Sequence, residues 1–305
     1  MTALRDALEA HNAYKSYESE GVLDIYFYRP AGALFALAGK RLGLTPNQLT
    51  TASLATGVAG AGLLYWDSWM WTGLGLLVLS GVFDASDGQL ARMTQSASLH
   101  GRILDGVADY CVFIATYLAL AAKYLSLNPD ASAVLIFTLA ALAGISHSIQ
   151  ASLFDYYRTE YTEYVDQRRI PKSDLESGAS EEGGRAARFL AWSHRDYTLR
   201  QRRLAASHVR LGEELLARRP DGTLDEKTAA AYRGLNLPVI RWWNLLGANS
   251  RLLVIAAALA ARRPELYFWA EVSFYNVWTL AARDRQERAD DELRHGFKTD
   301  SPPSG

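Results

Sequence analysis

This sequence of 305 residues has little cysteine and almost no net charge. The single cysteine, Cys111, excludes an intramolecular disulfide and any zinc site built from several cysteines. Because it falls inside an apolar run, we expect a buried and inert thiol. The formal net charge of −1 argues against a nucleic-acid-binding protein, since such proteins are normally basic.

An apolar signal-peptide core is also missing at the N-terminus. The first residues, "MTALRDALEAHNAYKSYESEG", are polar and carry charges of both signs. We therefore expect residues 1–28 to be retained as a cytoplasmic segment.

Long apolar runs are abundant, and a membrane span needs roughly 20 mostly apolar residues. Six runs qualify: Gln48–Tyr65, Trp69–Phe83, Asp105–Leu125, Ser132–Leu153, Asn244–Ala261 and Leu266–Ala282. Small residues within them suit close helix packing in a membrane, namely Gly57, Gly60, Gly62, Gly73 and Gly75. Trp and Tyr gather at the ends of the runs, where lipid headgroups would lie. The sequence predicts an all-α integral membrane protein with about six transmembrane helices; a soluble helical protein fits less well.

The segment before the first run, Arg29–Gly43, is apolar on one side and carries Lys40 and Arg41. This pattern predicts an interfacial helix on the membrane surface, with an ordinary amphipathic helix as the alternative. Basic residues around Arg92 and in the segment 155–241 place these connections and both termini on the cytoplasmic side. Two arginines at positions 262–263 fall on the other side and oppose this orientation weakly.

The chain then divides into five parts. After the segment 1–28, residues 29–154 carry the interfacial helix and four spans, and residues 155–241 form an Arg-rich cytoplasmic insertion. Within the insertion, "KSDLESGASEEGGR" is predicted to be flexible, and helical periodicity follows over 188–219. Residues 242–283 carry the last two spans. The charged residues 284–305 are predicted to form a disordered cytoplasmic tail.

Four carboxylates stand out in "FDASDGQLARMTQSASLHGRILDGVADY", which runs from Phe83 to Tyr110. Asp84 and Asp87 share one helix face, and Asp105 and Asp109 share a face of the next helix. If the two faces oppose each other, the carboxylates converge and need a cation between them. Oxygen ligands favour Mg²⁺, Mn²⁺ or Ca²⁺ over Zn²⁺. A pair of such ions suits phosphate chemistry.

Two further residue types in this stretch suit a phosphate ligand. Gly88 has no side chain, so a ligand can approach the helix closely, and Arg92 can hold a phosphate through two hydrogen bonds. The complete pattern resembles the signature of the CDP-alcohol phosphotransferases, integral membrane enzymes of phospholipid synthesis: Asp84-x2-Asp87-Gly88-x2-Ala91-Arg92-x8-Gly101-x3-Asp105-x3-Asp109. The resemblance covers roughly residues 29–153 and leaves the Arg-rich insertion without a counterpart.

The resemblance implies a role for each matched residue. Asp84, Asp87 and Asp105 are expected to bind two divalent ions, Mg²⁺ or Mn²⁺. Asp109 is expected to contact metal and to act as the general base on the acceptor hydroxyl. The residues expected to contact the cytidine nucleotide and its diphosphate are Gly88, Ala91, Arg92, the "NQLT" residues Asn47, Gln48, Leu49 and Thr50, and, with less weight, Ser98. A homodimer is implied as well.

The identity of the substrates stays open at this stage. One branch of the family transfers a phosphatidyl group from CDP-diacylglycerol to a small alcohol such as glycerol phosphate, serine, inositol, inositol phosphate or choline. The other transfers phosphocholine or phosphoethanolamine to diacylglycerol. Arg251, in the fifth run, favours an anionic acceptor such as a polyol phosphate, and weaker candidates for the same role are Arg158, Arg195, Arg200, Arg202 and Arg203.

Two other interpretations bear on the apolar runs. His147, inside the fourth run, is expected to make a helix–helix hydrogen bond rather than to act in catalysis. A non-enzymatic divalent-ion transporter is the alternative of another class, because acidic residues in spans can mark ion paths. Gly88 and Arg92 argue against it, since an arginine beside the carboxylates suits phosphate and not a cation path.

Overall fold

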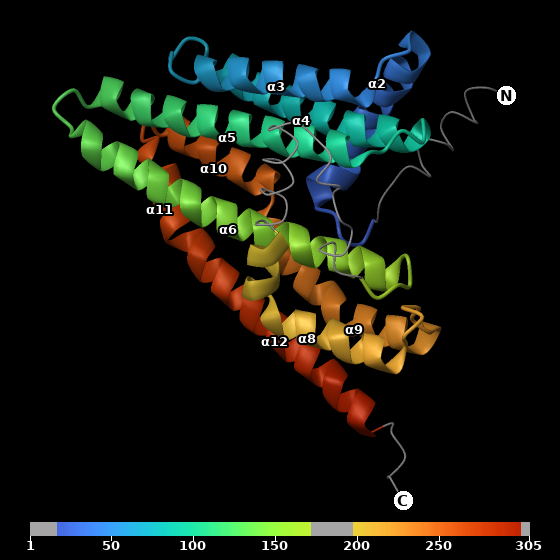
Figure 1. Ribbon diagram of the computed structural model, residues 1–305. Coiled ribbons are helices and arrows are strands. Elements are labelled where there is room, and N and C mark those ends of the chain that lie inside the picture. The colour runs from blue at the N-terminus through green and yellow to red at the C-terminus, as the bar shows by residue number, and fades with distance from the viewer. Residues whose placement is uncertain (1–16, 172–197, 300–305) are drawn as a thin grey trace, which may run out of the picture. The chain divides into compact units, whose positions relative to one another are not determined.

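The computed structural model describes residues 17–171 and 198–299 (Figure 1). Within these ranges the chain is helical and has no strand; one isolated bridge pairs Arg169 with Thr223. The all-α prediction is confirmed. The helices are η1 (Asp24–Tyr28), α2 (Arg29–Leu42), α3 (Pro46–Leu63), α4 (Met70–Met93), α5 (Leu99–Leu127), α6 (Ala133–Val165), α8 (Ala206–Arg218), α9 (Glu226–Trp243), η2 (Asn244–Leu246), α10 (Ala248–Ala260), α11 (Glu265–Val272) and α12 (Phe274–Thr299).

Contacts divide the chain into two compact units. Unit 1 comprises Met1–His147 and Ala248–Phe274, and unit 2 comprises Ser148–Gly247 and Tyr275–Gly305. The five-part division drawn from the sequence concerns membrane topology, and it stays a prediction.

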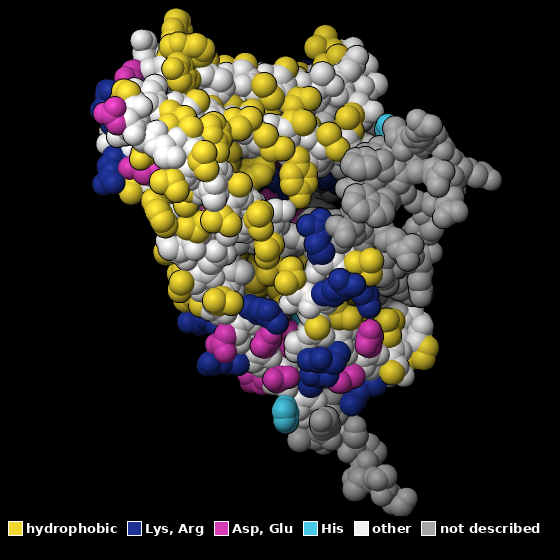
Figure 2. Space-filling view, turned by 60° about the vertical axis from the view of Figure 1, so that its left-hand side comes forward, with side chains coloured by type: hydrophobic (Ala, Val, Ile, Leu, Met, Phe, Trp, Pro, Cys, Tyr) yellow, Lys and Arg dark blue, Asp and Glu magenta, His cyan; other side chains and the backbone are white. Residues whose placement is uncertain are grey.

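Three stretches of the described chain are long and apolar enough to cross a membrane: His100–Leu127, Ala133–Val165 and Glu226–Ala260. Large apolar side chains are exposed on these helices, as expected for contact with lipid, among them Ile114, Leu118, Leu135, Ile145 and Leu253. Figure 2 shows hydrophobic side chains gathered over one part of the surface and charged side chains over another. These features suggest an integral membrane protein. The count of about six spans stays a prediction, as does the interfacial position of α2.

Glycines bring the first helices of unit 1 close together. A Cβ atom at Gly57 would lie 2.7 Å from the Ser80 Oγ, and one at Gly60 would lie 2.8 Å from the Gly73 carbonyl oxygen. The prediction of close packing is therefore confirmed for Gly57, Gly60 and Gly73. It is wrong for Gly62 and Gly75, which have no neighbour within 4 Å. Each lies two residues beyond a packed glycine, and two residues turn a helix by roughly 200°, to its opposite face.

The core of unit 1 lies among α4, α5, α6, α10 and α11. Its buried apolar side chains include Leu74, Tyr117, Leu120, Ala143, Leu259 and Phe268. A second, smaller core joins α2 to the start of α3 and the end of α4; its buried residues are Ala36, Leu49, Leu90 and Met93. Cys111 is exposed on α5, so the expectation of a buried thiol is wrong. The apolar run around Cys111 predicts the helix correctly, but it does not show which side of the helix is exposed.

Helix α12 corrects the predicted disordered tail. The helix continues to Thr299, well beyond the expected end at residue 283. Polar pairs within unit 2 hold this part: Asp290 accepts a hydrogen bond from Gln286, and its Oδ1 lies 2.9 Å from the Nδ1 of His208 on α8. Both members of the His208–Asp290 pair are fully buried. Burial works to lower the pKa of His208, but the charges of Asp290 and Glu160 hold the pKa above its usual value.

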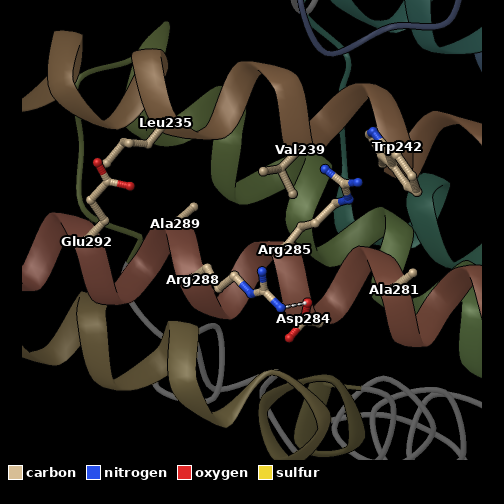
Figure 3. A pocket seen from close by; sticks show the side chains of 9 residues that line it. All are labelled: Leu235, Val239, Trp242, Ala281, Asp284, Arg285, Arg288, Ala289 and Glu292. Carbon is tan, nitrogen blue, oxygen red and sulfur yellow. Dashed lines mark ion pairs between the residues drawn. The ribbon is translucent and has the colours of Figure 1, made fainter.

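Helices α9 and α12 line a groove in unit 2, which Figure 3 shows from close by. Arg285 lies over the ring of Trp242 at 3.7 Å, and Trp242 stacks on Trp278 with ring centroids 4.3 Å apart. The groove also contains an ion pair between Arg288 and Asp284 at 2.8 Å. None of the residues that line it belongs to the acidic signature. The part of the insertion predicted to be flexible, Lys172–Arg185, lies outside the described residues.

Two glycines of α4 give a matched test of the helix packing. A Cβ atom at Gly73 would lie 2.6 Å from the Gly60 carbonyl oxygen, whereas one at Gly75 would meet nothing within 4 Å. We predict that Gly73→Ala lowers the melting temperature of the purified protein in detergent, because the two backbones must separate. Gly75→Ala should leave it unchanged or raise it, since alanine is favoured over glycine in a helix interior by about 1 kcal/mol. Equal effects of the two substitutions would contradict this packing.

Candidate active site

The start of α3 is fixed by local hydrogen bonds. Thr45 and Gln48 form a capping box: the Thr45 backbone N–H donates to Gln48 Oε1 at 2.9 Å, and Pro46 occupies the first turn. Leu49 is buried in the smaller core of unit 1. Gln48 and Leu49 were both predicted to contact the nucleotide. In the structure Gln48 caps α3 and Leu49 packs in the smaller core, while Asn47 is exposed.

The last turns of α4 carry the first acidic pair. Asp84 is half-buried, and Asp87 is buried and accepts a 2.5 Å hydrogen bond from the Thr50 hydroxyl. Burial and then the charge of Asp84 raise the pKa of Asp87 to about 7. An anionic Asp87 is therefore unfavourable here without a cation nearby.

Helix α5 begins at a serine cap and carries the second acidic pair. Ser98 has extended backbone geometry, and its Oγ accepts a 3.0 Å hydrogen bond from the Gly101 N–H. A Cβ atom at Gly101 would lie 3.2 Å from this Oγ and 3.6 Å from the Oδ1 of Asn47, so the starts of α3 and α5 adjoin. Ser98 was predicted to contact the nucleotide; its contact in the structure is a helix cap.

Three of the four predicted carboxylates come together. Asp84, Asp105 and Asp109 each offer an oxygen, and these oxygens lie within 4.8 Å of one another. Asp109 is the exposed member, so the cluster opens to a ligand. An all-oxygen donor set suits Mg²⁺ or Mn²⁺. Asp87 is not part of this group.

Arg92 lies five residues beyond Asp87 on the same helix. Its Nη1 would be 3.4 Å from a Cβ atom at Gly88, so the guanidinium lies against the helix at this glycine. Burial, and then the neighbouring charge of Arg29, lower the pKa of Arg92. A nearby anion would favour the charged form of the guanidinium. Ala91 is half-buried beside it.

Arg29 and Glu20 also lie near Arg92, and the sequence pattern does not predict this. Arg29 Nε donates to Glu20 Oε2 at 3.0 Å, and Gln89 Nε2 donates to the Arg29 carbonyl oxygen at 3.1 Å. The side chain of Glu20 is fully buried. No spacing rule links position 20 or 29 to position 92, so only the packing of α2 on α4 reveals these contacts.

Residues 43–173 match the family model described as CDP-alcohol phosphatidyltransferase. The chain carries a CDP-alcohol phosphatidyltransferase domain. The matched segment contains the carboxylate cluster, Arg92 and the start of α3, and the family resemblance inferred from the acidic signature is confirmed. No curated protein matches the chain.

Arg251 lies outside the matched segment and is buried on α10. Its Nε donates to Glu271 Oε1 on α11 at 2.9 Å. Tyr117 and His147 adjoin this pair: the Tyr117 hydroxyl is 3.1 Å from the His147 Nδ1, and that Nδ1 is 3.8 Å from Glu271 Oε1. His147 thus makes the expected helix–helix contact. Contact of Arg251 with an acceptor stays a prediction.

The weaker arginine candidates lie in or near the insertion. Arg158 is 5.9 Å from the Phe154 ring centroid, and Arg202 pairs with Glu213 at 3.5 Å. Both belong to unit 2, as do Arg200 and Arg203. Arg195 lies outside the described residues.

Substitutions of Ser98 distinguish its role as a helix cap from its predicted contact with the nucleotide. We predict that Ser98→Ala lowers the stability of the purified protein by about 1 kcal/mol, because an N-cap is lost. Ser98→Asp should restore stability, since aspartate also caps helices well. Thermal unfolding in detergent is the measurement. An unchanged melting temperature for Ser98→Ala, together with a raised KM for the nucleotide donor, would instead support the nucleotide contact.

Proposed function

We propose that this protein transfers a phosphatidyl group from CDP-diacylglycerol to the hydroxyl of a small polar alcohol and releases CMP, in phospholipid biosynthesis. The observation that carries the proposal is the cluster of Asp84, Asp105 and Asp109 inside the matched CDP-alcohol phosphatidyltransferase domain, with Arg92 nearby. The family supports phosphatidyl transfer from a CDP-alcohol; the choice of donor and acceptor belongs to the proposal.

The proposed site holds two divalent ions, Mg²⁺ or Mn²⁺. Asp84, Asp87, Asp105 and Asp109 would hold them, and the ions when bound supply positive charge to the phosphoryl oxygens. The all-oxygen donor set and the exposure of Asp109 support this assignment. Arg92, whose guanidinium lies against Gly88, would bind the diphosphate.

The reaction forms one P–O bond and breaks another. The acceptor oxygen bonds to the phosphorus that carries the lipid, and the bond from this phosphorus to the CMP oxygen breaks, so that CMP leaves with the electron pair. Asp109 would accept the proton of the acceptor hydroxyl, because it is the exposed carboxylate of the cluster. Arg92 stabilises the charge on the departing phosphate.

The nucleotide pocket is proposed at the adjoining starts of α3 and α5. Asn47 and Ser98 approach Gly101 there, and Gly88 and Ala91 leave room beside α4. We favour an anionic acceptor such as inositol phosphate or glycerol phosphate, because two arginines, Arg92 and Arg29, lie close together here. The active site is proposed on the cytoplasmic side of the membrane, and the protein is proposed to be a homodimer.

A second candidate keeps the site and exchanges the donor. CDP-choline or CDP-ethanolamine would then react with diacylglycerol, and the same carboxylates and Arg92 would serve. A divalent-ion transporter is less well supported, because Arg92 lies on the same helix as the acidic pair and would repel a passing cation.

The donor choice is testable by CMP release from the purified protein in detergent. We predict release with CDP-diacylglycerol and a panel of polyols and polyol phosphates, loss of release in EDTA, and recovery with Mg²⁺ or Mn²⁺. Release only with CDP-choline or CDP-ethanolamine plus diacylglycerol would establish the second candidate. Metal flux into vesicles with no CMP release would favour the transporter.

The proposed base has its own test. We predict that Asp109→Asn abolishes CMP release, by at least about a hundredfold as expected for a lost general base, while the protein remains folded. Asp130→Asn, which changes an exposed aspartate between α5 and α6, is the matched control and should keep full activity. Retained turnover in Asp109→Asn would exclude Asp109 as the base.

A further inference from the structure

Thr50 makes a short hydrogen bond to the acidic signature. Its Oγ1 lies 2.5 Å from Asp87 Oδ2 and 3.2 Å from the Pro46 carbonyl oxygen. A hydroxyl has one proton to donate, and the Asp87 carboxyl oxygen is the nearer of the two acceptors. Thr50 is 3% exposed and Asp87 is 7% exposed, so water does not compete for the bond.

Neighbouring contacts fix the hydroxyl in place. One turn further along α3, Ser53 Oγ donates to the Ser80 carbonyl oxygen on α4 at 2.9 Å. One residue before Thr50, Leu49 is buried against α2 and α4. These contacts set the register of α3 on α4, so Thr50 meets Asp87 without freedom to rotate away.

The bond also accounts for the separate position of Asp87. Three carboxylates gather to within 4.8 Å of one another, and Asp87 does not join them. An aspartate carboxylate otherwise rotates broadly about its last side-chain bond. Because Oδ2 already accepts from Thr50, Oδ1 is the oxygen better placed for a ligand, and the two oxygens cannot exchange places without breaking the bond.

We propose that Thr50 is a positioning residue that orients Asp87 as a ligand, so that one of the two divalent ions depends on the Thr50 hydroxyl while the ion at Asp84, Asp105 and Asp109 does not. The inference rests on the proposed function and replaces the earlier expectation that Thr50 lines the nucleotide pocket. A buried hydroxyl that donates to Asp87 acts on the nucleotide only through the carboxylate.

Mn²⁺ binding to the purified protein in detergent, followed by electron paramagnetic resonance, tests the proposal. Thr50→Val removes the hydroxyl and keeps the branched shape. We expect the weaker of the two Mn²⁺ sites to lose affinity about tenfold, the size expected for one hydrogen bond to a charged group, and the tighter site to remain. Thr50→Ser should restore both sites.

The next residue supplies a matched control. Thr51 is exposed, and its hydroxyl donates to the Asn47 carbonyl oxygen at 2.9 Å. Thr51→Val should bind two Mn²⁺ ions with unchanged affinity. Thr50→Ala, which adds no new contact, serves in place of Thr50→Val if the valine variant does not fold.

Steady-state kinetics separate positioning from nucleotide contact. Thr50→Val should raise the apparent KM for Mg²⁺ while the KM for the nucleotide donor at saturating Mg²⁺ stays unchanged. The reverse pattern would overturn the proposal in favour of a nucleotide contact.

The two proposals fail in different ways. If the wild-type protein binds Mn²⁺ and releases CMP but Thr50→Val binds Mn²⁺ equally well, the role of Thr50 is wrong and the proposed function stands. If the wild-type protein binds no Mn²⁺, the metal site and the role of Thr50 both fall.

Discussion

Carboxylates gathered at the ends of apolar helices repel one another, so the helices that carry them must be held together by other contacts. Asp84, Asp105 and Asp109 come together from α4 and α5. Both helices pack against α3 at glycine contacts that leave no room for a larger side chain. Glycines bring the α3 and α4 backbones together, and Ser98 fixes the first turn of α5. A divalent ion bound there, as proposed, would offset the repulsion, since it would supply positive charge.

The same packing supplies the second part of the site. Because α3 lies directly on α4, Thr50 reaches Asp87 and holds one of its oxygens. Because α2 also packs on α4, the Arg29–Glu20 ion pair adjoins Arg92. Arg92 and the first acidic pair, Asp84 and Asp87, therefore lie on one short stretch of α4. This is the combination that a metal-bound diphosphate requires.

Helical periodicity made much of the site predictable from the sequence. The spacing of Asp84 and Asp87, and of Asp105 and Asp109, placed each pair on one face, and the signature identified the family. Contacts between helices were beyond reach, because a sequence does not specify which turn of α3 meets which turn of α4. The Thr50–Asp87 bond and the different surroundings of Gly73 and Gly75 belong to this class. The charge of residues 284–299 was mistaken for disorder, since the buried partner of Asp290, His208, lies on another helix.

Anomalous X-ray scattering at the manganese edge, from crystals of the purified protein soaked in Mn²⁺, would locate the metal. We predict a manganese peak within coordination distance of the carboxylates of Asp84, Asp105 and Asp109, and its loss in Asp105→Asn. Manganese bound only elsewhere, or an empty carboxylate cluster at Mn²⁺ concentrations that support CMP release, would contradict it.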